Sequence, residues 1–252
     1  MNRVVRTVAG VRASAQSFFR ERLNLALLVV LPAVSIQVFG ISLSQFPESG
    51  FLTTTTSLGM TGRITGAVFA TGALAGVLGL FQIISARDAD RRLSICGFPA
   101  VDLLVSRFIT LVAICFVIAG IATVTLMGLV SKPVTSPVFV FSGLAIGGIT
   151  YAMLGILVGS VLPRELEGSL VLVILADMDN VLASGIFGIS ETFTRFSPLS
   201  YPHEIVTQAV LNGDFPSGNI LPAMLFVSVF GVLAVIAYTR TVEPVATGGG
   251  TQ

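Results

Sequence analysis

Residues 169–189 read SLVLVILADMDNVLASGIFGI, an apolar run with two aspartates near its middle. An α-helix rises about 1.5 Å per residue, so about 20 residues are enough to cross the hydrocarbon core of a bilayer. Each aspartate at the centre of such a helix costs about 2.5–3.5 kcal/mol on membrane insertion. The stretch therefore predicts a membrane helix in which Asp177 and Asp179 face protein or water rather than lipid.

Five further apolar runs of similar length accompany this one. The chain has 252 residues, of which 54% are hydrophobic and 11% are charged, whereas soluble domains carry about 25% charged residues. This composition predicts an all-α polytopic membrane protein, with residues 1–252 forming a single transmembrane domain and without a signal peptide. The six predicted spans are residues 24–43, 64–86, 108–130, 138–162, 169–189 and 220–238.

The arginines and the single lysine, 14 residues in total, fall mostly on one side of these spans. If the N-terminus is cytoplasmic, 11 of the 14 lie in cytoplasmic segments, and the outer segments hold Arg63, Lys132 and Arg195. Short cytoplasmic loops are enriched in such residues, so we expect both termini in the cytoplasm. The formal net charge of +1 leaves no basic surplus for binding nucleic acid.

The N-terminal segment, residues 1–23, has apolar side chains on one helical face and arginines on the opposite face. Its apolar residues recur at helical spacing from Val4 to Phe19, and Arg6 and Arg20 lie among the residues opposite. This pattern predicts an amphipathic helix in the cytoplasmic interface, with its arginines near anionic lipid headgroups. The alternative interpretation is a leader exposed to solvent.

Small residues recur at every fourth position in and beside two of the predicted spans. The pairs are Gly62 with Gly66, Gly72 with Gly76, and Gly155 with Gly159. Small residues at this spacing let the backbones of membrane helices approach closely. They predict close packing of these helices and indicate no particular function.

The connection between the second and third predicted spans reads RDADRRLSICGFPAVDLLVSR, residues 87–107. Helix–helix connections are commonly about 2–8 residues long, so a plain loop does not need this length. The segment begins with mixed charges, is interrupted at Gly97 and Pro99, and continues with an amphipathic helical pattern. A charge cluster that only fixes topology explains the arginines, but it explains neither the acids between them nor the second helix. We therefore expect a folded cytoplasmic surface here.

The segment FSPLSYPHEIVTQAVLNGD, residues 196–214, lies between the fifth and sixth predicted spans. Pro202 suits the first turn of a helix, and the pair Asn212-Gly213 suits its end. We expect a short helix that dips into the outer membrane interface. An ordinary extracellular helix fits the same residues equally well.

Motifs for catalysis and for nucleotide hydrolysis are absent from the sequence. A P-loop requires G-x-x-x-x-G-K-[ST], and Lys132 lies in SKPVTSP without that context. The metalloprotease motif H-E-x-x-H and the hydrolase motif G-x-S-x-G are missing as well. The single histidine, His203, has no His or Cys neighbours, and Cys96 and Cys115 indicate no disulfide framework. The sequence predicts a protein that is not an enzyme and that has no metal site or cofactor of its own.

The order and spacing of these segments resemble those of the permease subunits of ABC-2 type transporters, an export class of ATP-binding cassette systems. The lead-in helix, the stretch RDADRRLSICGFPAVDLL at the place of the family's coupling helix, LPRELEGSL after the fourth span and the outer segment all fit this order. The resemblance covers nearly the whole chain and rests on order and spacing rather than on one motif. Small drug-export subunits, including fluoroquinolone-export permeases, are similar in length and layout.

The resemblance implies a permease that lies in membrane lipid and exports a drug-like or lipid-like small molecule. A separate nucleotide-binding ATPase subunit would bind the ATP and dock on the cytoplasmic segment. A second permease copy, or a related permease, would complete the pathway. The residues implied in coupling to the ATPase are Arg87, Arg91, Arg92, Gly97, Phe98 and Asp102.

The acidic pair in the fifth predicted span has three interpretations. A helix turns about 100° per residue, so Asp177 and Asp179 point about 200° apart, while Asp177 and Asn180 share a face. These three residues line a polar translocation path at a subunit interface, or they are structural, or one aspartate carries protons in a secondary transporter. For the structural interpretation, the polar partners offered by neighbouring spans are Tyr151, Thr150 and Ser142.

Overall fold

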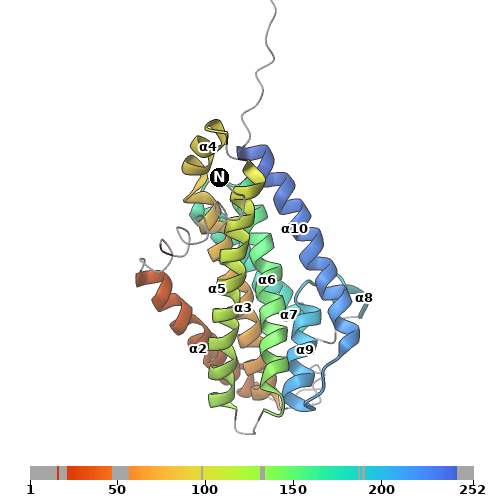
Figure 1. Cartoon of the computed structure of the whole chain (residues 1–252). Helices are drawn as coiled ribbons and strands as arrows, with labels where there is room; N and C mark the ends of the chain where they lie inside the picture. The colour runs from red at the N-terminus through yellow and green to blue at the C-terminus, as the bar shows by residue number, and fades with distance from the viewer. Residues whose placement is uncertain are drawn as a thin grey trace, which may run out of the picture.

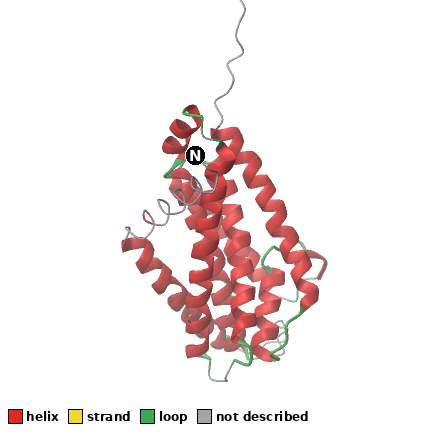
Figure 2. Cartoon of the chain, viewed as in Figure 1, coloured by secondary structure: helices red, strands yellow, loops and turns green. Residues whose placement is uncertain are grey.

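The computed structural model describes residues 16, 22–46, 57–97, 99–130, 134–186, 188 and 191–242. Within these residues every regular element is helical, as predicted, and none is a strand (Figure 2). The predicted interfacial helix over residues 1–23 lies almost entirely outside the described residues, and so do Phe98 and Lys132.

The long helices run roughly side by side as a bundle (Figure 1). In chain order the helices are α2 (Arg22–Ser44), α3 (Leu58–Ile84), α4 (Arg87–Ile95), α5 (Ala100–Leu129), α6 (Pro137–Val161), α7 (Glu165–Ala183), α8 (Glu191–Thr194), α9 (Ser200–Leu211) and α10 (Ile220–Val242), with a short 3-10 helix, η1 (Ser217–Asn219), before α10. One end of the bundle carries α4. At the opposite end, here called the distal end, α5 connects to α6 and α9 connects to α10 (Figure 1).

Among the described residues, five helices are long and apolar enough to cross a membrane. The five segments are Ala26–Ser44, Leu58–Ile84, Val101–Leu129, Pro137–Val161 and Ser217–Thr241. The chain is thus a helical, multi-pass protein of membrane type, as its composition predicts. Helix α3 begins at Leu58 rather than at 64, and α5 begins at Ala100 rather than at 108. These differences arise because hydropathy marks the apolar part of a helix and not the point where its hydrogen bonds begin.

The predicted span over residues 169–189 differs most from the structure. Its helix, α7, ends at Ala183, and Gly185 then adopts a φ of +66°, a conformation that favours glycine. Helix α7 is not one of the five apolar segments, because its 19 residues include four carboxylates. The remainder of the predicted span therefore belongs to the connection that leads to α8 and α9.

Helix α9 packs inside the bundle. At its start, Leu199 lies with Tyr151 of α6 beside Gly72 of α3. At its end, the Ser136 hydroxyl donates a hydrogen bond to the Gly213 carbonyl at 3.0 Å, close to the distal end of α6. Tyr151 is 14 residues from the start of α6, which is about 21 Å along a helix, so α9 begins near the middle of the bundle. The prediction of a short helix is confirmed, and this helix is buried more deeply than an interfacial helix would be.

Glycines allow α3 to pack closely against its neighbours. A Cβ atom at Gly66 would lie 2.6 Å from the Ser35 carbonyl oxygen of α2, and one at Gly155 of α6 would collide with the Gly76 carbonyl oxygen of α3. The predicted role of the small residues in helix packing is confirmed at these positions. As a result, α3 is buried over most of its length.

Candidate functional site

A buried carboxylate joins α7 to α6 and to the start of α9. Asp179 of α7 is 7% exposed. Its Oδ2 accepts hydrogen bonds from the Tyr151 hydroxyl at 2.8 Å and from the Leu199 backbone N–H at 3.1 Å. Its Oδ1 accepts a hydrogen bond from the Ser197 hydroxyl. These hydrogen bonds replace the hydration that the carboxyl group loses on burial.

The same carboxylate caps the N-terminus of α9. Leu199 is the N-cap residue, and its own side chain supplies no capping hydrogen bond. The first N–H groups of a helix have no partner within the helix, and they carry partial positive charge. The Asp179 carboxyl group therefore supplies an acceptor for the backbone N–H at the start of α9, at a point where Leu199 is fully buried.

The hydrogen bond from Tyr151 to Asp179 confirms one of the partners predicted under the structural interpretation. The other two candidates, Thr150 and Ser142, donate to carbonyl oxygens within α6 itself. The sequence does not predict the contact from Ser197. The available signal is a serine shortly before a helix start, which is typical of a capping region but does not identify a distant partner.

Asp177 lies on the other side of α7 and is exposed. The apolar residues exposed with it on α7 include Leu166, Leu170, Val173, Ile174 and Met178. A carboxylate thus interrupts an otherwise apolar surface of the bundle. This side of α7 is the outside of the chain, not the interior that holds Asp179.

Asn180 is fully buried, although the sequence predicts that it shares a face with Asp177. Neither Nδ2 nor Oδ1 of Asn180 has a hydrogen-bond partner among the described residues. The three residues predicted to line a path are therefore not brought together. Asp179 is held in its cluster, Asn180 is enclosed, and Asp177 is exposed.

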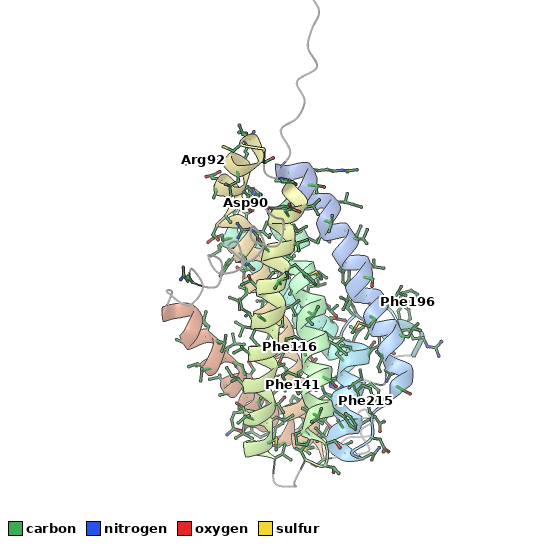
Figure 3. The ribbon with its side chains drawn as sticks, in the orientation of Figure 1. Asp90, Arg92, Phe116, Phe141, Phe196 and Phe215 are labelled. Carbon is green, nitrogen blue, oxygen red and sulfur yellow. The ribbon has the colours of Figure 1, made fainter. Side chains whose placement is uncertain are left out.

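The connection between α7 and α9 leaves regular helix part of the way along the bundle. Helix α8 lies at the level of the middle of α10 (Figure 1). Phe193 of α8 is 66% exposed, and Phe196, just after α8, is 77% exposed. Phe196 projects from the side of the bundle (Figure 3). Within a membrane, irregular backbone is tolerated only where it contacts protein or water. We therefore expect protein or water, rather than lipid, to cover this side of the chain.

His203 of α9 is buried against α3. Its Nε2 lies 3.3 Å from the Thr65 hydroxyl, and its Nδ1 lies 3.4 Å from the Thr207 hydroxyl. Among the described residues, no group of three or more His, Cys, Asp or Glu side chains could hold a metal ion.

A second buried carboxylate lies at the α4 end of the bundle. Asp90 of α4 is 1% exposed. Arg107 of α5 binds it through two hydrogen bonds, Nε to Oδ2 at 2.8 Å and Nη2 to Oδ1 at 2.6 Å. The Tyr238 hydroxyl of α10 donates to Oδ2 at 2.7 Å, and Arg107 Nη1 donates to the Gln82 carbonyl of α3 at 3.4 Å. Asp90 is thus an internal anchor of α4 that contacts α5 and α10 directly and α3 through Arg107.

Arg87, which the resemblance implies in ATPase contact, turns toward α6 instead. Its Nη2 donates to the carbonyl oxygens of Gly159 at 2.6 Å and Leu162 at 3.1 Å. The last carbonyls of a helix lack partners within the helix, and a cation there opposes the negative end of the helix dipole. Arg87 therefore caps α6.

The remaining residues implied in coupling have different environments. Arg91 and Arg92 are exposed, and Arg92 lies on the outer side of α4 (Figure 3). Gly97 ends the α4 region with a φ of +88° and open space around it. Asp102 is half-buried, and its Oδ2 has no partner among the described residues. Arg91, Arg92 and Gly97 therefore form the accessible part of the predicted coupling surface.

No model of a known protein family matches the chain, and a search of curated proteins likewise finds no match. Inferences about function therefore depend on the residues and geometry of the chain itself. The principal features are the multi-pass bundle, the cluster around Asp179 and the anchored helix α4.

Proposed function

We propose that the chain is the membrane-spanning permease subunit of an ATP-binding cassette exporter of the ABC-2 type. It resides in the plasma membrane with both termini and α4 in the cytoplasm, and its cargo is a drug-like or lipid-like molecule. The multi-pass helical architecture supports this proposal. The sequence lacks a P-loop, so a separate ATPase subunit binds the ATP and supplies the energy.

The observation that carries the proposal is the two-sided character of α4. On its inner side, Asp90 is held by buried hydrogen bonds. On its outer side, Arg91 and Arg92 are exposed together with Leu93 and Ile95, which are 38% and 68% exposed. A connection between two spans does not require this anchoring. A fixed helix that offers arginine and apolar side chains together suits the docking of a partner protein.

An interrupted helix makes the sixth crossing in this proposal. Helix α7 runs from the α4 end toward the middle of the bundle, and α9 continues from the middle to the distal end (Figure 1). Asp179 joins the two parts. Broken helices near the middle of a membrane are frequent in transporters, where helix ends surround the transport route. With six crossings, the two termini face the same side of the membrane.

A second permease copy, or a related permease, covers the exposed side of α7. A carboxylate at the position of Asp177 costs about 2.5–3.5 kcal/mol when it faces lipid at the centre of a span. Contact with protein or with a water-filled route at the interface of two copies removes this cost. The exposed irregular segment near Phe196 supports the same arrangement.

Affinity purification of the tagged chain from its native membrane tests the main proposal. We expect an ATPase subunit to co-purify, and ATP-dependent export to require both proteins. The double variant Arg91→Glu/Arg92→Glu should weaken ATPase binding, while the matched double variant Arg164→Glu/Arg240→Glu should bind normally. Both control arginines are exposed. Unchanged ATPase affinity and export in the Arg91/Arg92 variant would refute the docking assignment.

The alternative is a proton-coupled secondary transporter that uses Asp177 or Asp179. The exposure of Asp177 within an apolar surface is the observation in its favour. Liposomes that contain the chain alone, with a pH gradient imposed, distinguish the two candidates. Cargo flux that is driven by the gradient and abolished by Asp177→Asn or Asp179→Asn supports the alternative. Flux that requires ATP and the ATPase subunit supports the export permease.

A further inference from the structure

Asp90 connects the exposed helix α4 to the ends of two long helices. Arg107 lies near the start of α5, and Tyr238 lies near the end of α10. The side chains of Asp90 and Arg107 are 1% and 13% exposed. An ion pair that is largely removed from water is screened little by salt, and loss of one partner leaves the other charge uncompensated. Helix α4 therefore cannot shift relative to α5 and α10 without breaking buried polar contacts.

The stiffness of α4 depends on these contacts. The helix has only nine residues, and an isolated helix of that length is not stable in water. The paired bonds from Arg107 fix the plane of the Asp90 carboxylate, and the Tyr238 hydroxyl adds a third direction. A force applied to the outer side of α4 would therefore pass through Asp90 to α5 and α10.

We propose that Asp90, Arg107 and Tyr238 are positioning residues, which transmit the movement of α4 on partner docking to α5 and α10. This inference rests on the proposed function, since it requires an ATPase that docks at Arg91 and Arg92. It assigns the contact with the partner to exposed residues of α4, and the transmission of movement to the buried Asp90 of α4 together with Arg107 of α5 and Tyr238 of α10. The exposed arginines bind, and the buried cluster carries the displacement into the bundle.

The ratio of cargo exported to ATP hydrolysed separates this role from one that only keeps the connection folded. A variant that is merely less stable loses export and ATP hydrolysis together, in proportion to the amount of folded protein. A variant that has lost transmission keeps partner binding and ATP hydrolysis but exports less cargo per ATP. The melting temperature is measured alongside so that the two effects are not confused.

The test variants are Asp90→Asn, which removes the charge, and Tyr238→Phe, which removes one hydroxyl. Their matched controls are Asp88→Asn, an exposed carboxylate of the same helix, and Tyr201→Phe, whose hydroxyl bonds to a carbonyl far from α4. Each protein is assayed with its ATPase subunit in lipid nanodiscs and in proteoliposomes. Spin labels on the exposed native Cys96 and on Arg240→Cys report the distance between α4 and the end of α10.

We expect a narrow distance distribution in the parent and controls, and a broad one in Asp90→Asn and Tyr238→Phe. The two test variants should export about tenfold less cargo per ATP, within the usual range of coupling between sites, and should bind the ATPase as the parent does. An unchanged distance distribution, or an unchanged ratio of cargo to ATP, overturns the inference while leaving the proposed function in place. A parent chain that binds no ATPase overturns the proposed function, and the inference fails with it.

Discussion

Replacement of Asp179 by leucine tests whether this carboxylate holds the bundle together. The change removes the side-chain acceptor of the Tyr151 hydroxyl, the Ser197 hydroxyl and the Leu199 N–H. The two hydroxyls keep carbonyl acceptors, that of Leu175 at 3.3 Å and the backbone carbonyl of residue 179 at 3.2 Å, so the Leu199 N–H alone is stranded. A stranded donor costs about 1–3 kcal/mol and each of the two lost hydrogen bonds about 0.5–1.5 kcal/mol, so the total is about 2–6 kcal/mol. Leucine is easier to bury than a carboxyl group, which offsets part of this loss. We therefore expect a net destabilisation in the lower half of this range, about 3 kcal/mol.

Asparagine at position 179 should be tolerated much better. Its oxygen can accept from Tyr151 and Leu199 as Oδ2 of the aspartate does, and its amide can donate to the Ser197 hydroxyl, which rotates to accept. The loss is then limited to somewhat weaker hydrogen bonds, about 1 kcal/mol. Tyr151→Phe removes the hydroxyl and its buried hydrogen bond to Asp179, which is worth about 1.5 kcal/mol. The expected order of destabilisation is Asp179→Asn, then Tyr151→Phe, then Asp179→Leu.

Thermal unfolding in detergent micelles, followed by circular dichroism, measures this order. For a chain of this size, 1 kcal/mol shifts the melting temperature by about 2–4 °C, so Asp179→Leu should melt about 6–12 °C below the parent. The control is Asp177→Leu, which changes an exposed carboxylate of the same helix and should melt within about 2 °C of the parent. If Asp179→Leu melts with the parent yet no longer transports, the carboxylate acts in the transport route and the structural assignment is refuted.

Two further predictions concern other buried positions. Asn180→Leu should leave stability unchanged or raise it by about 1 kcal/mol, because neither amide atom has a described partner to lose; a clear drop in melting temperature would show that the amide is bonded after all. Gly155→Ala should destabilise the chain by about 1–3 kcal/mol, because its Cβ would collide with the Gly76 carbonyl oxygen. Gly128→Ala, which meets no atom within 4 Å, should be neutral or slightly stabilising in the same denaturation assay.

Much of the helical architecture is predictable from the sequence, because membrane helices satisfy their backbone hydrogen bonds locally. Runs of apolar residues locate α2, α3, α5, α6 and α10. The glycine pairs indicate which helices pack closely, and the interruption at Gly97 and Pro99 separates α4 from α5. Each of these signals lies within one segment of the chain.

The polar clusters are not predictable in the same way, because their partners are far apart in sequence. Asp90 resembles its neighbours in the run RDADRR, and it is distinguished by its partners Arg107 and Tyr238, which lie 17 and 148 positions away on other helices. Likewise, Asp177 and Asp179 point to different sides of α7, and the sequence does not show which of the two sides faces Tyr151 and Ser197. The start of α9 also depends on a tertiary contact, because the buried N–H of Leu199 would have no acceptor in the middle of the bundle without the Asp179 carboxyl group.

The placement of the partners of Asp179 has a consequence for biogenesis. Tyr151 is synthesised before Asp179, whereas Ser197 and Leu199 emerge from the ribosome after it. In the proposed topology α7 forms half of a membrane crossing. When α7 is first inserted, Asp179 has only part of its hydrogen bonding, and the penalty of about 2.5–3.5 kcal/mol for an acid within the membrane is not yet offset. We therefore expect stable integration of α7 only after α9 has been made. A nascent chain that stops before Ser197 should hold α7 loosely at the membrane, while one that extends through Leu211 should hold it in the bundle.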